Sequence, residues 1–296
     1  MDTNHRLPAL LVLALTVWLL GSPPAVRAGD DGTYEVTAFV ITTWDGGCDA
    51  NTVDDWDRLV RAWYYEMLND AAPPDGHGAG AWDIGWLNND GYIVDSQFVD
   101  PSRQPWGNDV EYTEMPDAFM AGLHGSNDVN DHRWKGRVKF NEEGGGNCSA
   151  YQGDIRLGDG DLEFLHLSSC YSMDYEDWWN EWNSSFNGLH QVDGFHGIMY
   201  IGEGFVRCYR RFADDSFWIS IAESWVDHLY SSPWYMGNHD QCPVARVVGT
   251  DENDSRDRLN SERYNHMFPD PPGVGEDRHH RAKYISGCNP RGKGEL

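Results

Sequence analysis

Short apolar runs of strand length alternate along this chain with longer segments of helical periodicity. Residues 34–42 alternate in polarity and are rich in β-branched side chains, which predicts a first strand. Residues 53–68 place their apolar side chains on one helical face, and aspartates occupy the first turn. Continuous apolar runs over residues 117–123, 162–167 and 244–248 predict buried strands.

Weaker signals fill the intervals between these elements. They predict an extended segment over residues 92–99, an inserted hairpin with a glycine loop over residues 134–146 and a Trp-rich helix over residues 175–186. They also predict a short strand over residues 195–201 and a further helical stretch over residues 212–230. Strands that alternate with helices favour a mostly parallel sheet covered on both faces by helices. The sequence therefore predicts an α/β fold.

The two ends of the chain differ in composition from its centre. Residues 1–28 combine an uncharged apolar run with a small-residue cleavage site, which indicates a secretory signal and an extracytoplasmic location. Residues 29–249 are expected to form one domain, because no linker or repeat divides them. Residues 250–296 are charged, Pro-rich and aperiodic, which predicts an irregular segment that wraps the surface.

The chain is strongly acidic, with 48 Asp and Glu residues against 22 Lys and Arg residues and a formal charge of -26. Only four of the basic residues are lysines. This balance excludes nucleic acid and anionic membranes as expected partners, because no basic stripe is present to neutralise phosphates. It is typical either of adaptation to a salty habitat or of an ordinary acidic secreted protein.

Two strand ends carry candidate chemistry. The run over residues 117–123 is followed by His124 and Gly125, and the run over residues 162–167 leads through Ser169 to Cys170. Carboxyl ends of parallel strands are where sites form in open α/β sheets. A thiol with an imidazole as acid and base can transfer acyl groups, and a glycine lets main-chain N–H groups approach the substrate carbonyl.

Simpler interpretations compete with this dyad. Six cysteines in an exported protein first suggest three disulfides, so Cys170 would be a bridge partner or a buried thiol. If Cys170 is free, at least one other cysteine is unpaired, and a bridge to Cys288 would anchor the tail. His166, His190 and His196 have no metal-site spacing, so no metal and no cofactor are expected.

The strand ending in His124-Gly125, followed by a strand ending in Ser169-Cys170, resembles the caspase–gingipain–legumain group of cysteine peptidases. The resemblance implies a caspase-like three-layer sandwich, with His124 as acid and base and Cys170 as nucleophile. It also implies an oxyanion hole made by the Gly125 and Cys170 N–H groups. Strings spread over residues 36–249 also resemble a bacterial family of secreted proteins without established activity.

These observations favour an exported cysteine peptidase or related amide hydrolase that acts on a peptide or protein. The alternative from another class is a secreted binding or surface protein that keeps the fold without turnover. A glycoside hydrolase would need a pair of carboxylates at a defined separation, and no such pair stands out in the sequence. Substrate specificity, oligomeric state and zymogen processing leave no signal in the sequence.

The excess of carboxylates predicts a protein that is stabilised by salt. Raising KCl to about 1 M shortens the Debye length to about 3 Å and so weakens repulsion among surface charges. We expect the thermal unfolding midpoint to rise between low and molar KCl. A midpoint that stays constant or falls would contradict adaptation to salt.

Overall fold

The computed structural model describes residues 34–44, 48, 52–70, 82–89, 93–127, 133–140, 146–174, 182–232 and 237–296. The expected secretory signal and the first part of the expected Trp-rich helix lie outside these residues. Where the helix would end, residues Trp182–Ser184 form a 3-10 turn.

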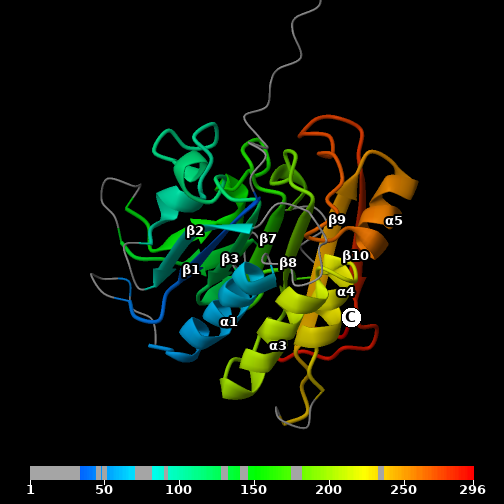
Figure 1. Cartoon of the computed structure of the whole chain (residues 1–296). Coiled ribbons are helices and arrows are strands. Elements are labelled where there is room, and N and C mark those ends of the chain that lie inside the picture. The colour runs from blue at the N-terminus through cyan, green and yellow to red at the C-terminus, as the bar shows by residue number, and fades with distance from the viewer. Residues whose placement is uncertain are drawn as a thin grey trace, which may run out of the picture.

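A seven-stranded sheet forms the centre of the molecule, in the order β10-β9-β8-β7-β3-β1-β2 (Figure 1). Its strands are β1 (Tyr34–Val40), β2 (Trp82–Asn89), β3 (Ala118–Gly122), β7 (Phe164–Ser168), β8 (Gln191–His196), β9 (Cys242–Gly249) and β10 (His279–Tyr284). Neighbours from β2 to β8 pair in parallel, whereas β9 runs antiparallel to both β8 and β10. The predicted mostly parallel sheet is confirmed.

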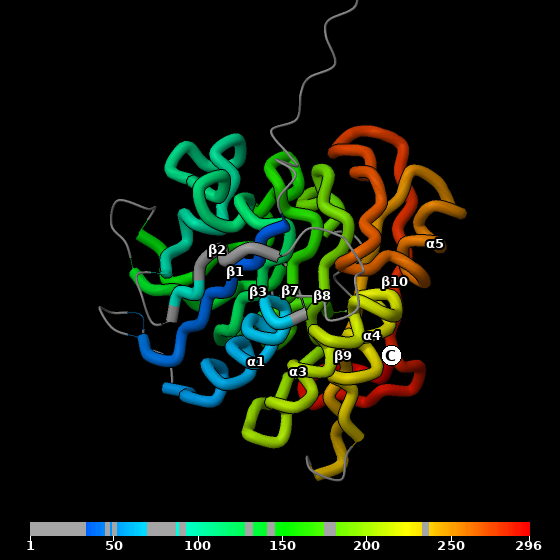
Figure 2. The backbone as a smooth tube through the Cα atoms, in the orientation of Figure 1, coloured from blue at the N-terminus to red at the C-terminus, as the bar shows by residue number. Residues whose placement is uncertain are grey.

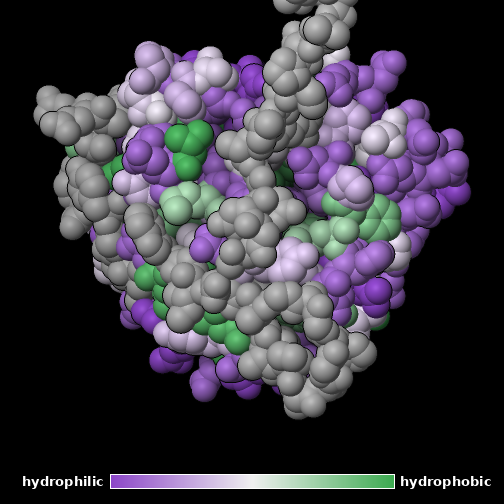
Figure 3. Space-filling model, turned by 45° about the horizontal axis from the view of Figure 1, so that its top comes forward, coloured by the Kyte–Doolittle hydropathy of each residue, from purple (hydrophilic) through white to green (hydrophobic). Residues whose placement is uncertain are grey.

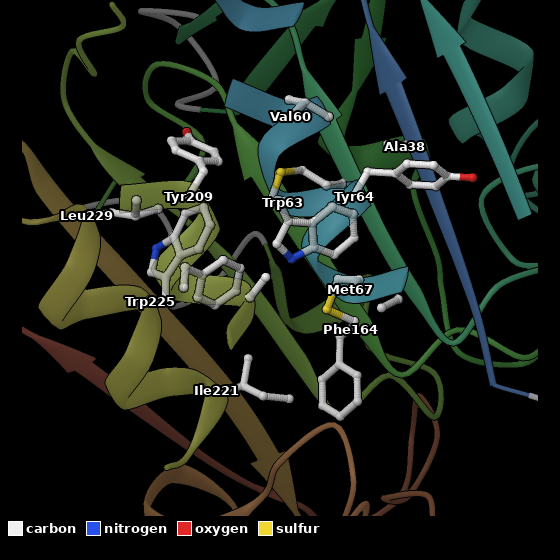
Figure 4. Packing of buried hydrophobic residues seen from close by; sticks show 14 of the residues in the cluster. Ala38, Val60, Trp63, Tyr64, Met67, Phe164, Tyr209, Ile221, Trp225 and Leu229 are labelled. Atoms are coloured by element: carbon white, nitrogen blue, oxygen red, sulfur yellow. The ribbon is translucent and has the colours of Figure 1, made fainter. Parts of the chain in front are cut away.

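Helices cover one face of this sheet. They are α1 (Asp55–Asp70), α3 (Glu203–Asp215), α4 (Ile221–Leu229) and α5 (Glu252–Ser261). Their apolar side chains pack against the sheet in a first core cluster. Figure 4 shows Trp63 of α1 and Trp225 of α4 entering this cluster together with Phe164 of β7. All three side chains have an exposed fraction of zero, so each contributes about 2 kcal/mol or more through burial.

The opposite face is covered by a second core cluster beneath short elements. Within the described part of the chain these are the 3-10 helices Asp95–Phe98, Asp109–Glu111, Gln152–Asp154 and Trp182–Ser184. A small sheet of β4 (Gly125–Asn127), β5 (Trp134–Arg137) and β6 (Ser149–Tyr151) lies with them. The fold is thus a three-layer α/β sandwich, as predicted. Within the described residues, its second layer contains no α-helix.

A polar network lies inside the first cluster, between β7, β8 and the segment after α5. His166 and Asp193 have no exposed surface, and their Nδ1 and Oδ2 atoms are 2.8 Å apart. The hydroxyl of Tyr264 lies 2.7 Å from His166 Nε2, and the Gln191 amide donates to Asp193. Burial raises the pKa of Asp193, and the hydrogen bond and charge of His166 partly offset that effect.

The C-terminal segment departs from the prediction. An irregular course was expected over residues 250–296, but Glu252–Ser261 forms α5 and His279–Tyr284 forms β10. Asp251 caps α5 by accepting hydrogen bonds from Asn253 and Asp254, a local signal that the aperiodic composition concealed. Strand β10 is polar because it lies at the edge of the sheet, so apolar periodicity could not reveal it.

Three other differences concern element boundaries. The expected extended segment over residues 92–99 contains a 3-10 turn. The helical stretch over residues 212–230 belongs to two helices, α3 and α4. Strand β8 begins before the expected residues 195–201. Strand β2 was not expected. The inserted hairpin is the β5–β6 pair of the small sheet.

Two disulfides link distant parts of the chain, Cys48–Cys148 and Cys242–Cys288. Cys170 and Cys208 are free thiols. The dyad requires an unpaired Cys170, and this expectation is confirmed, as is at least one bridge among the other five cysteines. The bridges are compatible with an extracytoplasmic location, because disulfides persist in oxidising compartments.

The described residues seen in Figure 3 are mostly hydrophilic and are interrupted by small apolar patches. This agrees with the strongly acidic composition. Within the described ranges, every helix is too short or too polar to cross a bilayer.

Candidate active site at the carboxyl edge of the sheet

Strands β3 and β7 end at the same level, which brings the two candidate segments together. The strands pair in parallel with Gly122 opposite Ser168. Leu123 continues the pairing by donating its N–H to the Ser168 carbonyl at 3.3 Å. His124 and Cys170 therefore lie on neighbouring strand ends at one edge of one sheet, as predicted.

Both side chains belong to the helical face of the sheet. Leu123 is buried in the second core cluster, whereas the following His124 packs against Trp56 of α1. The centroids of the His124 and Trp56 rings are 4.7 Å apart, and Trp44 packs on the same imidazole at 4.7 Å. Cys170 contacts the first cluster, on the same face. Two indoles thus restrict the orientation of the imidazole.

Gly125 is pressed against the turn that holds Cys170. A Cβ atom on Gly125 would lie 2.0 Å from the Cys170 carbonyl oxygen and 2.3 Å from Ser169 Oγ. Real Cβ contacts are essentially never this short, so only glycine fits here without moving the main chain. The Ser169 hydroxyl accepts a hydrogen bond from the Trp134 indole at 3.1 Å, which anchors this turn to the small sheet.

The hydrogen-bond pattern of the β4–β5 ladder bears on the main-chain N–H groups of Gly125 and Cys170. The Arg137 N–H donates to the His124 carbonyl, which makes Gly125 and Gly136 a non-hydrogen-bonded pair of the β4–β5 ladder. The Gly125 N–H is therefore directed away from β5. The Cys170 N–H donates to no main-chain acceptor within the described residues.

The Cys170 thiol is partly exposed and begins a tight turn. Its Sγ lies 3.8 Å from the Met199 carbonyl oxygen, to which it donates. Tyr171 follows with φ of +59°, a left-handed conformation that is unusual for a residue with a side chain and often occurs at functional sites. Burial raises the pKa of Cys170 above its ordinary value, so the thiol is protonated at neutral pH and needs a base for attack.

Asp174 joins several segments behind this turn. It is almost fully buried and accepts hydrogen bonds from Asn127 at 2.6 Å and from the Gly197 N–H at 2.9 Å. Lys293 Nζ lies 3.0 Å from its second oxygen, and His196 Nδ1 is 3.5 Å from its first. Burial alone would raise the pKa of Asp174, but the bonds from His196, Gly197 and Lys293 outweigh it and lower the pKa.

The C-terminal segment runs beside the same edge (Figure 2). The Ile198 N–H donates to the Arg291 carbonyl, and the Gly294 carbonyl oxygen lies 2.9 Å from His196 Nε2. The disulfide between Cys242 and Cys288 ties the start of this segment to β9. A part of the chain that is far from Cys170 in sequence thus forms one wall of the edge.

A pocket of about 440 Å³ opens beyond Met199. Among the described residues its wall contains no charged side chain. It is lined by Tyr200, Ile201, Gly202, Gly204, Phe205, Cys208, Tyr230 and Ser231. Ile201, Phe205 and Cys208 pack against the same core cluster as Cys170. Cys170 Sγ contacts the Met199 carbonyl oxygen, and the next residue, Tyr200, lines the pocket, so this stretch of chain connects the thiol with the pocket.

The three histidines weighed as zinc ligands are not brought together. His166 belongs to the buried network with Asp193, and His196 contacts Asp174 at the carboxyl edge. His190 precedes β8 at the opposite edge and contacts Glu262. No zinc site built on these three residues exists in the structure.

Sequence reasoning missed several residues of this edge. Trp56 was assigned only to the apolar face of its helix, and its contact with His124 depends on tertiary packing. Asp174 carried one usable signal, its place four residues after the candidate nucleophile. Met199 and Lys293 carried none, because only the fold brings them to Cys170 and Asp174.

The protein is an α/β sandwich in which a free thiol and an imidazole lie on adjoining parallel strand ends at the carboxyl edge of the sheet. The chain belongs to the family described as a domain of unknown function, DUF6345, which matches residues 79–286. The matched range includes His124, Gly125 and Cys170. No curated protein and no solved structure matches the chain.

The close approach of Gly125 to Cys170 predicts a steric penalty on substitution. Gly125→Ala should lower the free energy of unfolding by about 1–3 kcal/mol, because main-chain atoms must separate to admit the methyl group. The matched control is Gly204→Ala in α3, where a Cβ meets nothing within 4 Å. Urea unfolding should show a loss for Gly125→Ala alone, and an equal response of both variants would refute the contact.

The lowered pKa of Asp174 predicts a pH-dependent contribution to stability. The carboxylate favours the folded state above the ordinary aspartate pKa, and this contribution disappears as pH falls through the lower folded-state pKa. Asp174→Asn should cost about 3 kcal/mol at pH 7 and progressively less in acid. Chemical unfolding at several pH values measures this, with the exposed Asp227→Asn as control. A constant difference between parent and Asp174→Asn at all pH values would contradict the assignment.

Proposed function

We propose that this protein is a cysteine peptidase or related amide hydrolase, with Cys170 as nucleophile and His124 as acid and base. The observation that carries the proposal is the contact of the Gly125 main chain with the Cys170 turn. It joins the two strand ends so closely that a substrate carbonyl beside Cys170 would also meet the Gly125 N–H. The resemblance to caspase-like peptidases assigns the same roles to these residues.

The chemistry follows from the properties of the thiol. Because burial raises the pKa of Cys170, His124 takes the thiol proton as sulfur attacks the substrate carbonyl. The Gly125 and Cys170 N–H groups stabilise the oxyanion that forms. The C–N bond then breaks, the amine leaves with the proton from His124, and a thioester remains. Water, deprotonated by His124, hydrolyses the thioester and restores the thiol.

The neighbouring pocket supports a substrate with an apolar or aromatic side chain. Its lining offers Ile201, Phe205 and Tyr230 and no charged group to pair with a substrate ion. A charged side chain would lose its hydration there without gaining a partner, whereas an apolar one would bury its surface. The acidic surface of the protein further disfavours substrates rich in carboxylates.

Export of the protein is part of the proposal. The apolar run within residues 1–28 and its small-residue cleavage site indicate secretion. The two disulfides support an oxidising destination. A peptidase in that compartment would meet proteins or peptides outside the cytoplasm.

Turnover of peptide amides tests the proposal. A panel of amides with apolar, aromatic, basic and acidic side chains next to the scissile bond should be cleaved, with preference for the first two classes. Cys170→Ala should abolish cleavage, and His124→Ala should lower kcat by at least about a hundredfold. Cys208→Ser removes the pocket thiol and serves as the matched cysteine control.

Thiol labelling in the Cys208→Ser background separates an enzyme from a binding protein. Cys170 should react with iodoacetamide, and His124→Ala should slow that reaction near neutral pH and shift it toward higher pH. Rapid labelling without cleavage of any amide, at low and at molar salt, would refute the peptidase and favour a binding role.

A further inference from the structure

The amino edge of the sheet, opposite Cys170, holds a second polar cluster. Glu163 directly precedes β7 and His190 directly precedes β8, and the His190 N–H donates to the Glu163 carbonyl at 2.9 Å. Asp270 comes from the segment that follows α5, which lies at this edge in Figure 1. One ligand atom from each of these three residues lies within 4.8 Å of the other two.

His190 is oriented as metal-binding histidines are. The side chain is 1% exposed, and its Nδ1 lies 2.7 Å from Glu262 Oε1. Its Nε2 is buried without a hydrogen-bond partner among the described residues and lies 3.6 Å from Asp270 Oδ1. A carboxylate that holds one ring nitrogen while the other ring nitrogen faces further ligand residues is the usual support of a metal-bound imidazole.

Glu262 is itself fixed as a carboxylate. It has no exposed surface and accepts hydrogen bonds from the Phe268 N–H at 2.8 Å and from Arg258 at 3.4 Å. With a proton on Nδ1 pointing at Glu262, neutral His190 presents the lone pair of Nε2 to the cluster. The Phe164 ring, 5.6 Å from the imidazole, restricts its rotation.

Negative charge accumulates around Glu163. Glu163 Oε2 is buried without a hydrogen-bond partner within the described part of the chain. Burial raises the pKa of Glu163, and the charges of Asp117, Asp161 and Asp270 raise it further. A divalent cation between these carboxylates would relieve both the repulsion and the missing partner.

We propose that Glu163, His190 and Asp270 bind a divalent transition-metal ion of the zinc class, at a site separate from the proposed active site. One imidazole nitrogen and two carboxylates suit zinc, whereas Ca²⁺ and Mg²⁺ prefer oxygen ligands alone. In tetrahedral zinc sites the ligand atoms lie about 3.4 Å apart, close to the His190–Asp270 distance of 3.6 Å.

The proposed site is closed by the protein on one side and accessible on the other. Asp270 is 46% exposed, so an ion can enter there and water can complete its coordination. The ion would fasten the segment after α5 to the amino ends of β7 and β8. The sequence gives no sign of this site, because the ligands come from three remote segments without a recognisable spacing.

Zinc titration of the full chain tests the proposal. Cys170→Ala with Cys208→Ser removes both free thiols, and about 1 M NaCl suppresses diffuse binding to the acidic surface. After dialysis against EDTA, calorimetry with ZnCl₂ should give one ion per chain, and the thermal midpoint should rise. The same concentration of MgCl₂ should leave the midpoint unchanged, and an equal rise with both salts would overturn the proposal.

Single substitutions locate the ion. Glu163→Gln, His190→Gln and Asp270→Asn should each weaken zinc binding by at least about tenfold. Asp270→Asn is the most informative, because this half-exposed residue is not needed for core packing. Glu276→Gln, an exposed carboxylate of the same segment, should bind zinc like the parent. Parent-like affinity in both Glu163→Gln and Asp270→Asn, or absence of a one-to-one complex, would refute the site.

Discussion

The parallel pairing of β3 with β7 is the contact on which the rest of this structure depends. Every residue of both strands is buried, since helices cover one face and the small sheet with its 3-10 turns covers the other. Because parallel strands of equal length end together, the residues that follow them meet at one edge. The imidazole, the glycine and the thiol owe their proximity to this register.

Each edge of the sheet holds a buried carboxylate, and the surroundings of the two carboxylates differ. At the carboxyl edge, Asp174 is buried but receives donors from Gly197, Lys293 and Asn127, so it remains ionised. At the amino edge, Glu163 is surrounded by other carboxylates, and its ionisation is disfavoured. This acidic chain therefore buries Asp174 beside the ammonium group of Lys293 and buries Glu163 among other carboxylates.

Local patterns in the sequence predict those parts of the structure that neighbouring residues encode. Strands β1, β3, β7 and β9 and helix α1 follow from apolar periodicity, and the same apolar runs place His124 and Cys170 at the ends of β3 and β7. What remains hidden depends on distant segments. Trp44 and Trp56 reach His124, and Lys293 reaches Asp174, only after folding. The catalytic roles of the two strand-end residues and the secretory signal stay predictions.

The buried network of Tyr264, His166, Asp193 and Gln191 also selects the alignment of the strands. An apolar strand such as β7 has few features that distinguish the native register from a register shifted by one residue. A slip of one residue would turn His166 to the opposite face and leave Asp193 buried without its partner. Misaligned chains would thus bury an aspartate that has lost its imidazole partner, a defect that costs more than most lost methyl contacts. These four polar side chains thereby favour one alignment of β7, the strand whose end carries Cys170.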